Sequence, residues 1–469
     1  MTRRWSERPL VVLIAPDAFK GSLGSAEAAQ AIAAGWRRQR PQDRLDLCPL
    51  ADGGDGFGPV LAQWLGAEQR SCDTVDAAGR PRRARWWLAP GPPPQAIVES
   101  AEAIGLALLP QALRHPWPPD QPALTRPELA GCVGDPPALQ GQGPPRPERR
   151  VAPPVDGRES GLRRHGAGSP ASEQDAQRPQ GAASGSPWRQ RLGLDSRGLA
   201  PLLLAAHAAG AERLLLGLGG SATNDGGFGL AQALGWRFRD ANGAPIACWG
   251  DLERLERLEP PQLLAPLPQL VLAVDVANPL LGPQGASAVY GPQKGLTAEQ
   301  QPRAEACLRR LAQCLEPLHP GVAERPGSGA AGGLGYGLQV FCGGRLRAGA
   351  ELVAELCGLE RRLAAADLVI SGEGRFDGQS LMGKGVGSLL ARARRLGRDS
   401  LVLAGQLEAE ALRRAQAEAA AQGCDLEARA LVPDLTDLAR ASAEPALWLE
   451  RLAQRAAADL AGSRAVPQP

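Results

Sequence analysis

The chain has 469 residues, of which 43% are hydrophobic, and a formal net charge of +2. It is therefore long enough for two domains, and it lacks the basic surplus typical of nucleic-acid binding. The first apolar run, residues 10–15, is too short for a signal peptide or a membrane span, and nine scattered cysteines without a CxxC pair fit a reducing compartment. We therefore expect a cytoplasmic protein that binds neither nucleic acid nor membranes.

The first predicted element is a strand at residues 11–14, a continuous apolar run typical of a buried parallel strand. A helix over residues 26–37 follows, with Ser25 as a plausible N-cap and Glu27 in its first turn. Similar apolar strands recur at residues 214–218, 270–276, 367–370 and 401–404. Strands that alternate with helices predict an α/β protein with a largely parallel sheet.

Residues 114–191 interrupt this alternation. The segment holds 15 of the 43 prolines in the chain, with many Gly, Ser and Gln residues and no apolar periodicity. Such a composition cannot bury enough apolar surface to offset the entropy of ordering the chain. We interpret the segment as a disordered insertion on a surface loop, and an arginine-rich interaction arm is the alternative.

The polar candidates cluster in glycine-rich loops that follow the predicted strands, where open α/β sheets bind ligands. These loops are residues 15–21, 51–56, 219–227, 275–280 with 291–295, and 371–377 with 383–385. The three lysines of the chain, Lys20, Lys294 and Lys384, each stand beside a glycine in one of them. Glycines that expose backbone N–H groups, together with lysines and carboxylates, suit a magnesium-bound polyphosphate. Phosphoryl transfer needs no His or Cys nucleophile.

Other readings of these loops stay open. Residues 378–385 resemble a P-loop, but Gly385 stands where that motif needs a Ser or Thr to hold magnesium, so we reject a genuine P-loop here. Asp52 and Asp225 could each serve as a turn or cap residue beside a glycine pair. Residues 332–335 are best explained by close backbone packing. Taken together, however, the loops favour a ligand site.

Seven motifs in order resemble the glycerate kinase family that lacks a P-loop: APDAFKG at 15–21, ADGGDG at 51–56, GGSATNDGG at 219–227, DVANPL at 275–280, GPQKG at 291–295, GAAGGLG at 329–335 and SGEGRFDGQSLMGKG at 371–385. The resemblance implies a kinase that uses ATP and Mg²⁺ to phosphorylate D-glycerate. The expected product is 2-phosphoglycerate, and 3-phosphoglycerate is possible.

The resemblance also implies two α/β domains with the active site in the cleft between them. A flavodoxin-like domain with a parallel sheet would comprise residues 1–62 and 285–463. The second α/β domain, residues 63–284, would be inserted in it and carry the 114–191 segment.

Each candidate residue receives a role as a hypothesis. The catalytic set is Lys20, Asp275, Lys294 and Glu373, in which the lysines contact phosphate or the glycerate carboxylate, and Asp275 and Glu373 act as base or magnesium ligand. Arg375 would clamp the carboxylate in bidentate fashion. The substrate-binding and phosphate-binding set is Asp17, Gly219, Gly220, Ser221, Thr223, Asn224, Arg375 and Lys384, and the metal set is Asp52, Asp225 and Asp377.

Two rival functions remain. The family pattern of a His-Pro stretch leading to Ser-x-Gly is split here between His115-Pro116 and Ser196-Arg197-Gly198. If that stretch closes over substrate, the chain could be a pseudo-kinase that binds nucleotide without turnover. It could also be an interaction protein that works through residues 114–191. A different small acid as acceptor is a narrower alternative, and the sequence leaves the oligomeric state open.

Overall fold

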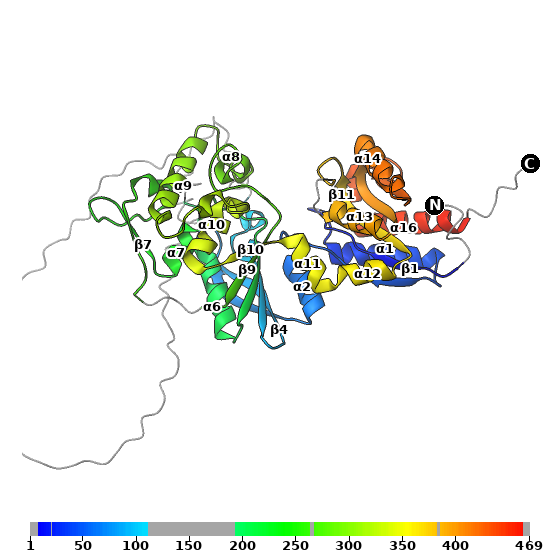
Figure 1. Ribbon diagram of the computed structural model, residues 1–469, viewed down its shortest axis with the longest axis horizontal. Coiled ribbons are helices and arrows are strands. Elements are labelled where there is room, and N and C mark those ends of the chain that lie inside the picture. The colour runs from blue at the N-terminus through cyan, green and yellow to red at the C-terminus, as the bar shows by residue number, and fades with distance from the viewer. Residues whose placement is uncertain (1–7, 20, 111–192, 263–266, 382–384, 463–469) are drawn as a thin grey trace, which may run out of the picture.

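The computed structural model describes residues 8–19, 21–110, 193–262, 267–381 and 385–462. It contains two large β-sheets, each with helices on both faces, in two bodies that lie side by side in Figure 1. The segment predicted to be disordered, residues 114–191, lies outside the described residues, as do Lys20 and Lys384. The predicted α/β class is confirmed.

The first sheet has five parallel strands, in the order β13 (Leu426–Val432), β12 (Asp399–Leu407), β11 (Leu368–Phe376), β1 (Val11–Ile14) and β2 (Arg44–Leu47). Counted along the chain, the order is 2-1-3-4-5, which is the flavodoxin-like order. The strand order reverses between β1 and β11, so their carboxyl ends form the switch point where such sheets bind ligands.

Helices cover both faces of this sheet, because successive apolar side chains of its buried strands point to opposite faces. Val12 and Ile14 pack against α1 (Ser25–Gln39) and α16 (Pro445–Gly462), whereas Leu13 faces the side covered by α12 (Leu359–Ala365) and α13 (Gly385–Arg395). Helix α14 (Ala409–Ala420) packs beside α13 on that second side, and α15 (Leu438–Ala443) precedes α16. Gly35 lets α1 and α16 touch, since a Cβ there would lie 2.0 Å from the Glu450 carbonyl oxygen.

The second sheet has six strands, in the order β10 (Arg345–Ala348), β9 (Gln269–Val274), β6 (Arg213–Gly217), β5 (Gln95–Glu99), β4 (Pro81–Ala89) and β3 (Glu68–Val75). The first four are parallel, and β4 and β3 run antiparallel at one edge. One face packs on α2 (Phe57–Leu65) and α11 (Gly349–Cys357). The other packs on α3 (Ala101–Ile104), α6 (Ala200–Ala208), α7 (Phe228–Ala233) and α10 (Ala330–Cys342).

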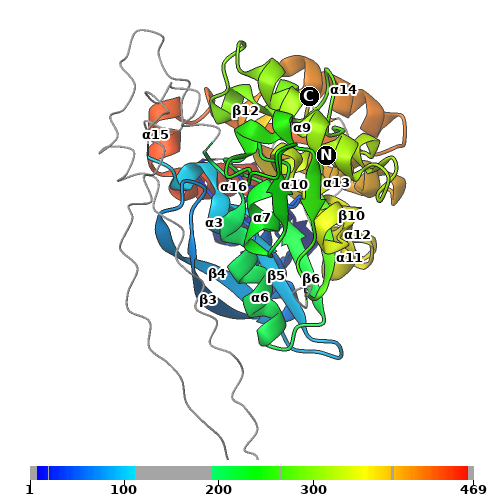
Figure 2. The same ribbon diagram turned by 90° about the vertical axis from the view of Figure 1, so that its left-hand side faces the viewer.

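A smaller subdomain adjoins this second sheet. It contains the hairpin of β7 (Arg237–Arg239) and β8 (Arg257–Glu259), and helices α8 (Ala286–Tyr290) and α9 (Gln301–Leu315), packed around one hydrophobic cluster. Figure 2 views the molecule from this end. None of the described helices is long and apolar enough to cross a bilayer.

The predicted limits of the inserted domain, 63 and 284, need correction. Strand β10 pairs with β9, so the second sheet extends to residue 348. Helix α2 packs on the same sheet from Phe57 onward. The later limit escaped prediction because β10, with the sequence RLRA, is a short edge strand, which needs no continuous apolar run.

The chain crosses between the two sheets twice. Residues 48–56 lead from β2 to α2, and residues 349–367 lead from β10 through α11 and α12 to β11. Figure 1 shows α2 and α11 between the two bodies. The carboxyl ends of strands from both sheets can therefore contribute to one region next to these crossings.

Candidate active site

Three loops meet at the carboxyl ends of the second sheet, and glycines allow them to touch. A Cβ on Gly219 would lie 2.3 Å from the Cα of Gly54, and one on Gly53 would lie 2.6 Å from the carbonyl oxygen of Ala273. Any side chain at these positions would push the loops apart. The motifs at 51–56 and 219–227 and the end of β9 thus form one continuous surface.

Two predicted carboxylates lie at the start of α11 beside these loops. Asp275 Oδ1 accepts hydrogen bonds from the backbone N–H groups of Gly349 (2.9 Å) and Ala350 (3.3 Å). Asp52 Oδ1 accepts one from Gly54 (2.9 Å), and the Asp52 carbonyl oxygen lies 2.1 Å from the Cβ position of Gly349. Both side chains are half-buried. Asp275 thus caps a helix whose positive end favours anions.

Lys294 reaches the loop that follows β6 from the 3₁₀ turn Pro292–Lys294. Its buried ammonium group donates to Thr223 O (2.6 Å) and Ser221 Oγ (3.0 Å). Burial lowers the pKa of Lys294 to about 7, and the charge of Asp225 acts in the opposite direction. Three residues predicted separately, Ser221, Thr223 and Lys294, therefore lie together.

The neighbouring Asn224 is equally buried. Its Nδ2 donates to Ser287 Oγ on α8 at 2.9 Å. Within the described part of the chain, neither Asn224 Oδ1 nor Thr223 Oγ1 has a hydrogen-bond partner. An unsatisfied buried polar group costs about 1–3 kcal/mol, so these atoms are suited to receive a ligand.

The glycines at the start of this loop have structural roles. Gly219 O accepts a hydrogen bond from Ser100 Oγ (3.0 Å), and Gly220, with φ +63°, accepts one from the Leu106 N–H (2.8 Å). Likewise, a Cβ on Gly332 would lie 2.0 Å from Thr223 O, which agrees with the close-packing explanation of residues 332–335.

Asp225 is fully buried and serves as a structural residue. Its carboxylate accepts hydrogen bonds from Ser196 Oγ (2.7 Å) and from the N–H groups of Ser196 (2.9 Å), Gly229 (2.9 Å) and Gly227 (3.2 Å). Burial, and secondarily the charge of Asp195, raises its pKa. The cap alternative fits these contacts, and a metal-ligand role does not, because both oxygens are already engaged.

The predicted metal set of Asp52, Asp225 and Asp377 does not come together. Asp377 follows β11 of the first sheet, where its Oδ1 accepts from the Gln379 N–H (2.9 Å) and its Oδ2 lies 3.4 Å from Arg375 Nε. Across the described ranges, no group of three His, Cys, Asp or Glu side chains could hold a metal ion. Arg375 is 65% exposed and paired with Asp377 rather than buried in a cleft.

At the switch point of the first sheet, Asp17 follows β1, and Glu373 lies on the neighbouring strand β11. The Asp17 N–H donates to Gly372 O at 2.8 Å, and Glu373 is the next residue of β11. A Cβ on Gly385 would lie 2.6 Å from Asp17 Oδ2, so the backbone after the GKG motif lies directly against this carboxylate.

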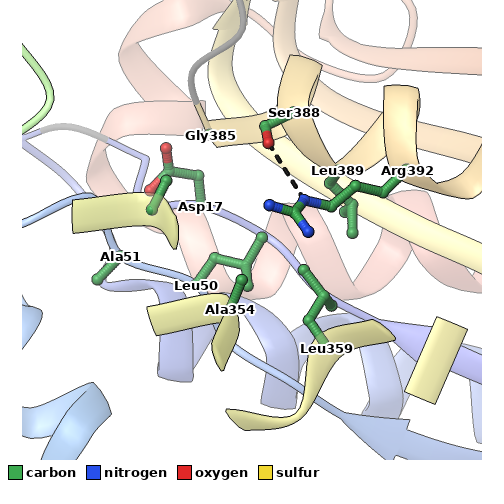
Figure 3. A pocket seen from close by; sticks show the side chains of 10 residues that line it. Asp17, Leu50, Ala51, Ala354, Leu359, Gly385, Ser388, Leu389 and Arg392 are labelled. Carbon is green, nitrogen blue, oxygen red and sulfur yellow. Dashed lines mark hydrogen bonds between the residues drawn. The ribbon is translucent and has the colours of Figure 1, made fainter. Parts of the chain in front are cut away.

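Figure 3 shows a small pocket beside Asp17, between α13 and the second crossing. Apolar side chains, among them Leu50 and Leu389, line most of it. Arg392 points into it from α13, donates to Ser388 Oγ (3.5 Å) and pairs with Glu351 and Glu360. Prediction missed Arg392, because an arginine within an amphipathic helix resembles any solvent-facing residue.

Glu99, the last residue of β5, was also missed. Its Oε1 accepts a 2.5 Å hydrogen bond from the Gly58 N–H, which joins β5 to the start of α2. Burial raises its pKa to about 7, with a smaller contribution from Glu102, while the Gly58 N–H opposes the shift. A carboxylate at the end of an apolar strand was the available signal.

Comparison with known proteins gives one consistent result. The model of the glycerate kinase family matches residues 12–120 and 182–461. Curated relatives include a glycerate kinase of Halalkalibacterium halodurans (32% identity, 84% of this chain and 85% of the relative) and a glycerate 2-kinase of Escherichia coli K12 (33% identity, 80% and 79%). A crystal structure of a protein assigned as glycerate kinase 2 from Salmonella typhimurium LT2 aligns with a TM-score of 0.66 at 30% identity, over 97% of this chain and 98% of that one.

Proposed function

The chain belongs to the glycerate kinase family, and on this basis we propose that it transfers the γ-phosphoryl group of MgATP to D-glycerate to give 2-phosphoglycerate. Its relatives establish that it is a kinase. The choice of D-glycerate, ATP and Mg²⁺, and of the 2-phosphate over the 3-phosphate, is our proposal.

The observation that carries this proposal is the buried Lys294 on the loop after β6. Its ammonium group lies against Ser221 Oγ and Thr223 O in a site with almost no solvent. A cation held in such a site acts strongly on an anionic substrate, because little water screens it. Phosphoryl transfer requires this kind of positioning and charge compensation more than a nucleophilic side chain.

Asp17 and Glu373 have the chemistry to hold Mg²⁺ with nucleotide phosphates. Magnesium is bound through one or two carboxylates, with waters and substrate phosphates completing its shell, so a cluster of three acidic side chains is not needed. Asp17 follows β1 and Glu373 lies on β11, the two strands that form the switch point of the first sheet. The bound ion would neutralise charge on the phosphates. Lys20 and Lys384 stay candidates for phosphate contact.

Asp275 is our candidate for accepting the proton of the attacking hydroxyl group. The N–H groups of Gly349 and Ala350 orient its carboxylate at the start of α11. It follows β9 of the second sheet, whereas Asp17 and Glu373 belong to the first sheet, after β1 and on β11. We propose that the two substrates bind at these two edges and meet between the sheets.

The purified protein with MgATP and D-glycerate tests this function. ADP release that depends on glycerate would support it, and phosphorus NMR would separate 2-phosphoglycerate from 3-phosphoglycerate. Binding of MgATP without turnover would instead favour the pseudo-kinase. Turnover with other small hydroxy acids but not with glycerate would replace the proposed acceptor.

A further inference from the structure

Two adjacent residues beside Lys294 offer unsatisfied polar atoms inside the protein. Asn224 and Thr223 are 3% and 0% exposed, and in the described residues Asn224 Oδ1 and Thr223 Oγ1 make no hydrogen bond. Lys294 donates to the main-chain carbonyl of Thr223 itself. A cation and an amide oxygen acceptor thus lie one residue apart on the same loop.

The hydrogen bond from Asn224 Nδ2 to Ser287 Oγ determines which end of the amide is available. The amide nitrogen donates to α8, so among the described residues the oxygen is the end of this side chain that lacks a hydrogen-bond partner. An amide oxygen only accepts hydrogen bonds, and an ammonium group only donates them. The complementary ligand must therefore carry an anionic acceptor for Lys294 and a hydroxyl donor for Asn224.

We propose that Lys294 and Asn224 bind the acceptor substrate as a hydroxy acid, with its carboxylate on the Lys294 ammonium group and a hydroxyl group on Asn224 Oδ1. The proposal rests on the proposed function and narrows it, since it assigns these two residues to the acceptor rather than to the nucleotide. Asn224 then becomes a specificity-determining residue that distinguishes hydroxy acids from plain carboxylates.

Two other ligands fit less well. A fully ionised phosphate group accepts hydrogen bonds but donates none, so it leaves Asn224 Oδ1 unsatisfied. A divalent cation could bind the amide oxygen, but the ammonium group of Lys294 would repel it, and the oxygens of nearby Asp225 are already engaged.

Titration calorimetry with D-glycerate, without nucleotide, tests the proposed binding to Lys294 and Asn224 in the unmodified protein. The pKa of Lys294 is about 7, and a bound carboxylate raises the pKa of a neighbouring amine. Binding at pH 8 should therefore take up close to one proton, measured from the heats in two buffers of different ionisation enthalpy. Glycerate binding with no proton uptake, or tight binding of Mg²⁺ or inorganic phosphate alone that competes with glycerate, would overturn the proposal.

The Asn224→Ala variant tests the hydroxyl contact. We expect its affinity for D-glycerate to fall at least 10-fold. Its affinity for whichever of lactate and 3-hydroxypropionate lacks the contacted hydroxyl should change less than 2-fold. Asn242→Ala, at an exposed turn of the same sheet body, is the matched control and should leave every affinity unchanged.

Kinetics separate this proposal from the kinase assignment. If the wild type turns over glycerate while Asn224→Ala raises only the KM for ATP, the kinase assignment stands, and the assignment of Lys294 and Asn224 to the acceptor is wrong. If no turnover occurs but glycerate binding depends on Asn224, the acceptor assignment stands, and the kinase assignment is wrong. Should the variant fail to fold, the proton-uptake measurement on the wild type still decides.

A different observation concerns the two crossings between the sheets. The thiols of Cys48 and Cys357 face each other with their sulfurs 3.5 Å apart, and both residues are buried. Cys48 opens the first crossing directly after β2, and Cys357 ends α11 in the second. Although these residues are 309 positions apart in the sequence, their contact links the two connections between the sheets.

Arg362 distinguishes the two thiols. Its Nε donates to Cys357 O at 2.8 Å, its guanidinium lies 4.5 Å from the Trp64 ring, and it pairs with Asp46. The hydrogen bond from Cys48, together with the charge of Arg362, lowers the pKa of the Cys357 thiol. The same pairing and burial raise the pKa of Cys48. Cys357 is therefore the nucleophilic partner.

We infer that Cys48 and Cys357 form a reversible disulfide under oxidation by hydrogen peroxide, which would lock the two crossings together. The Cys357 thiolate attacks one peroxide oxygen and breaks the O–O bond, which gives a sulfenic acid and hydroxide. The Cys48 thiol then attacks the sulfenic sulfur and expels water. Overall, two thiols and one peroxide give one disulfide and two waters.

Mass spectrometry of the full chain after peroxide treatment and alkylation tests this device. We expect a cross-linked peptide pair containing Cys48 and Cys357, lost on reduction and absent from Cys357→Ser but present in the control Cys314→Ser. Turnover, where measurable, should fall on oxidation in the wild type and not in Cys48→Ser. Unlinked Cys48 and Cys357, or a pair involving another cysteine, would overturn the inference, and the wild type alone suffices to decide it.

Discussion

The ammonium group of Lys294 donates a 2.6 Å hydrogen bond to the main-chain carbonyl of Thr223, 71 residues earlier in the chain. This contact joins the GPQKG motif to the GGSATNDGG motif and places a lysine in a site from which water is nearly excluded. The contribution of Lys294 to turnover and its contribution to the free energy of unfolding can be tested separately.

Replacing Lys294 by methionine keeps the length of the side chain and removes its charge. We expect turnover of glycerate to fall roughly 100-fold or more, as is typical when a preorganised charge in a dry site is lost. Steady-state kinetics at pH 8 measure the effect, and circular dichroism checks the fold. A variant that retains more than half of the wild-type kcat/KM would show that Lys294 contacts neither substrate.

The same variant should change how stability depends on pH. Lys294 has a pKa lowered to about 7 in the folded protein, whereas an unfolded lysine titrates near 10.4. Between these values only the unfolded chain binds the proton, so stability rises with pH by about 1.4 kcal/mol per unit. Urea unfolding of wild type and Lys294→Met between pH 7.5 and 9.5 should show this slope in their difference. Parallel curves would contradict the lowered pKa.

Glu99 should give a dependence of opposite sign at lower pH. Burial raises its folded pKa to about 7, so between about 4.3, the unfolded value, and 7 the folded protein binds the extra proton. The stability that Glu99 contributes in acid is lost as pH rises through this window. Glu99→Gln keeps an acceptor for the Gly58 N–H. Its stability relative to wild type should therefore increase from pH 5 to pH 7 and stay constant above.

The outcome for the carboxylates shows what sequence can and cannot predict. The glycine-rich motifs at 51–56 and 219–227 lie at the carboxyl ends of strands, as predicted for parallel sheets, whereas residues 371–376, predicted as a loop, belong to β11. The motifs could not distinguish a ligand from a cap. Asp225 and Asp275 both stand in polar or glycine-rich loops that follow apolar strands. Asp225 is fully buried and accepts four hydrogen bonds, whereas Asp275 is half-buried at the start of a helix. The difference arises from residues elsewhere in the chain, because Ser196 donates to Asp225 and Gly349 donates to Asp275.

The limit of the inserted domain was missed for a related reason. The three central strands of the first sheet, β1, β11 and β12, were predictable because they are apolar runs buried on both faces. The limit of the second body depended on β10, whose RLRA sequence pairs through its backbone with β9 and buries little of its own surface. Arg392 and Cys48 were not predictable either, since their significance lies in contacts across the crossings.

Asp225→Asn tests the structural assignment of this residue. The asparagine presents an N–H₂ group where Asp225 now accepts hydrogen bonds, so some donors of Ser196, Gly227 and Gly229 lose their acceptor. We expect destabilisation by about 2–4 kcal/mol, measured by urea unfolding. Asp377→Asn, on the exposed loop after β11, is the control and should change stability by less than about 0.5 kcal/mol. An Asp225→Asn variant of normal stability with a raised requirement for Mg²⁺ would restore the metal-ligand role.

Removal of residues 121–181 tests whether the segment that the family model leaves unmatched is needed. The family match ends at 120 and resumes at 182, so the deletion removes only residues outside the family match. Downstream of the deletion, the N–H and hydroxyl groups of Ser196 donate hydrogen bonds to Asp225. The deletion removes neither of these residues. Loop-closure entropy changes by only about 0.6 kcal/mol per doubling of loop length, so the shortened chain should fold with a thermal transition close to that of the wild type.

Glycerate turnover of the deletion variant, followed by ADP release, should be kept or increased. A folded deletion variant without turnover would show that these residues take part in the reaction, and loss of a binding partner with unchanged turnover would show a separate interaction role.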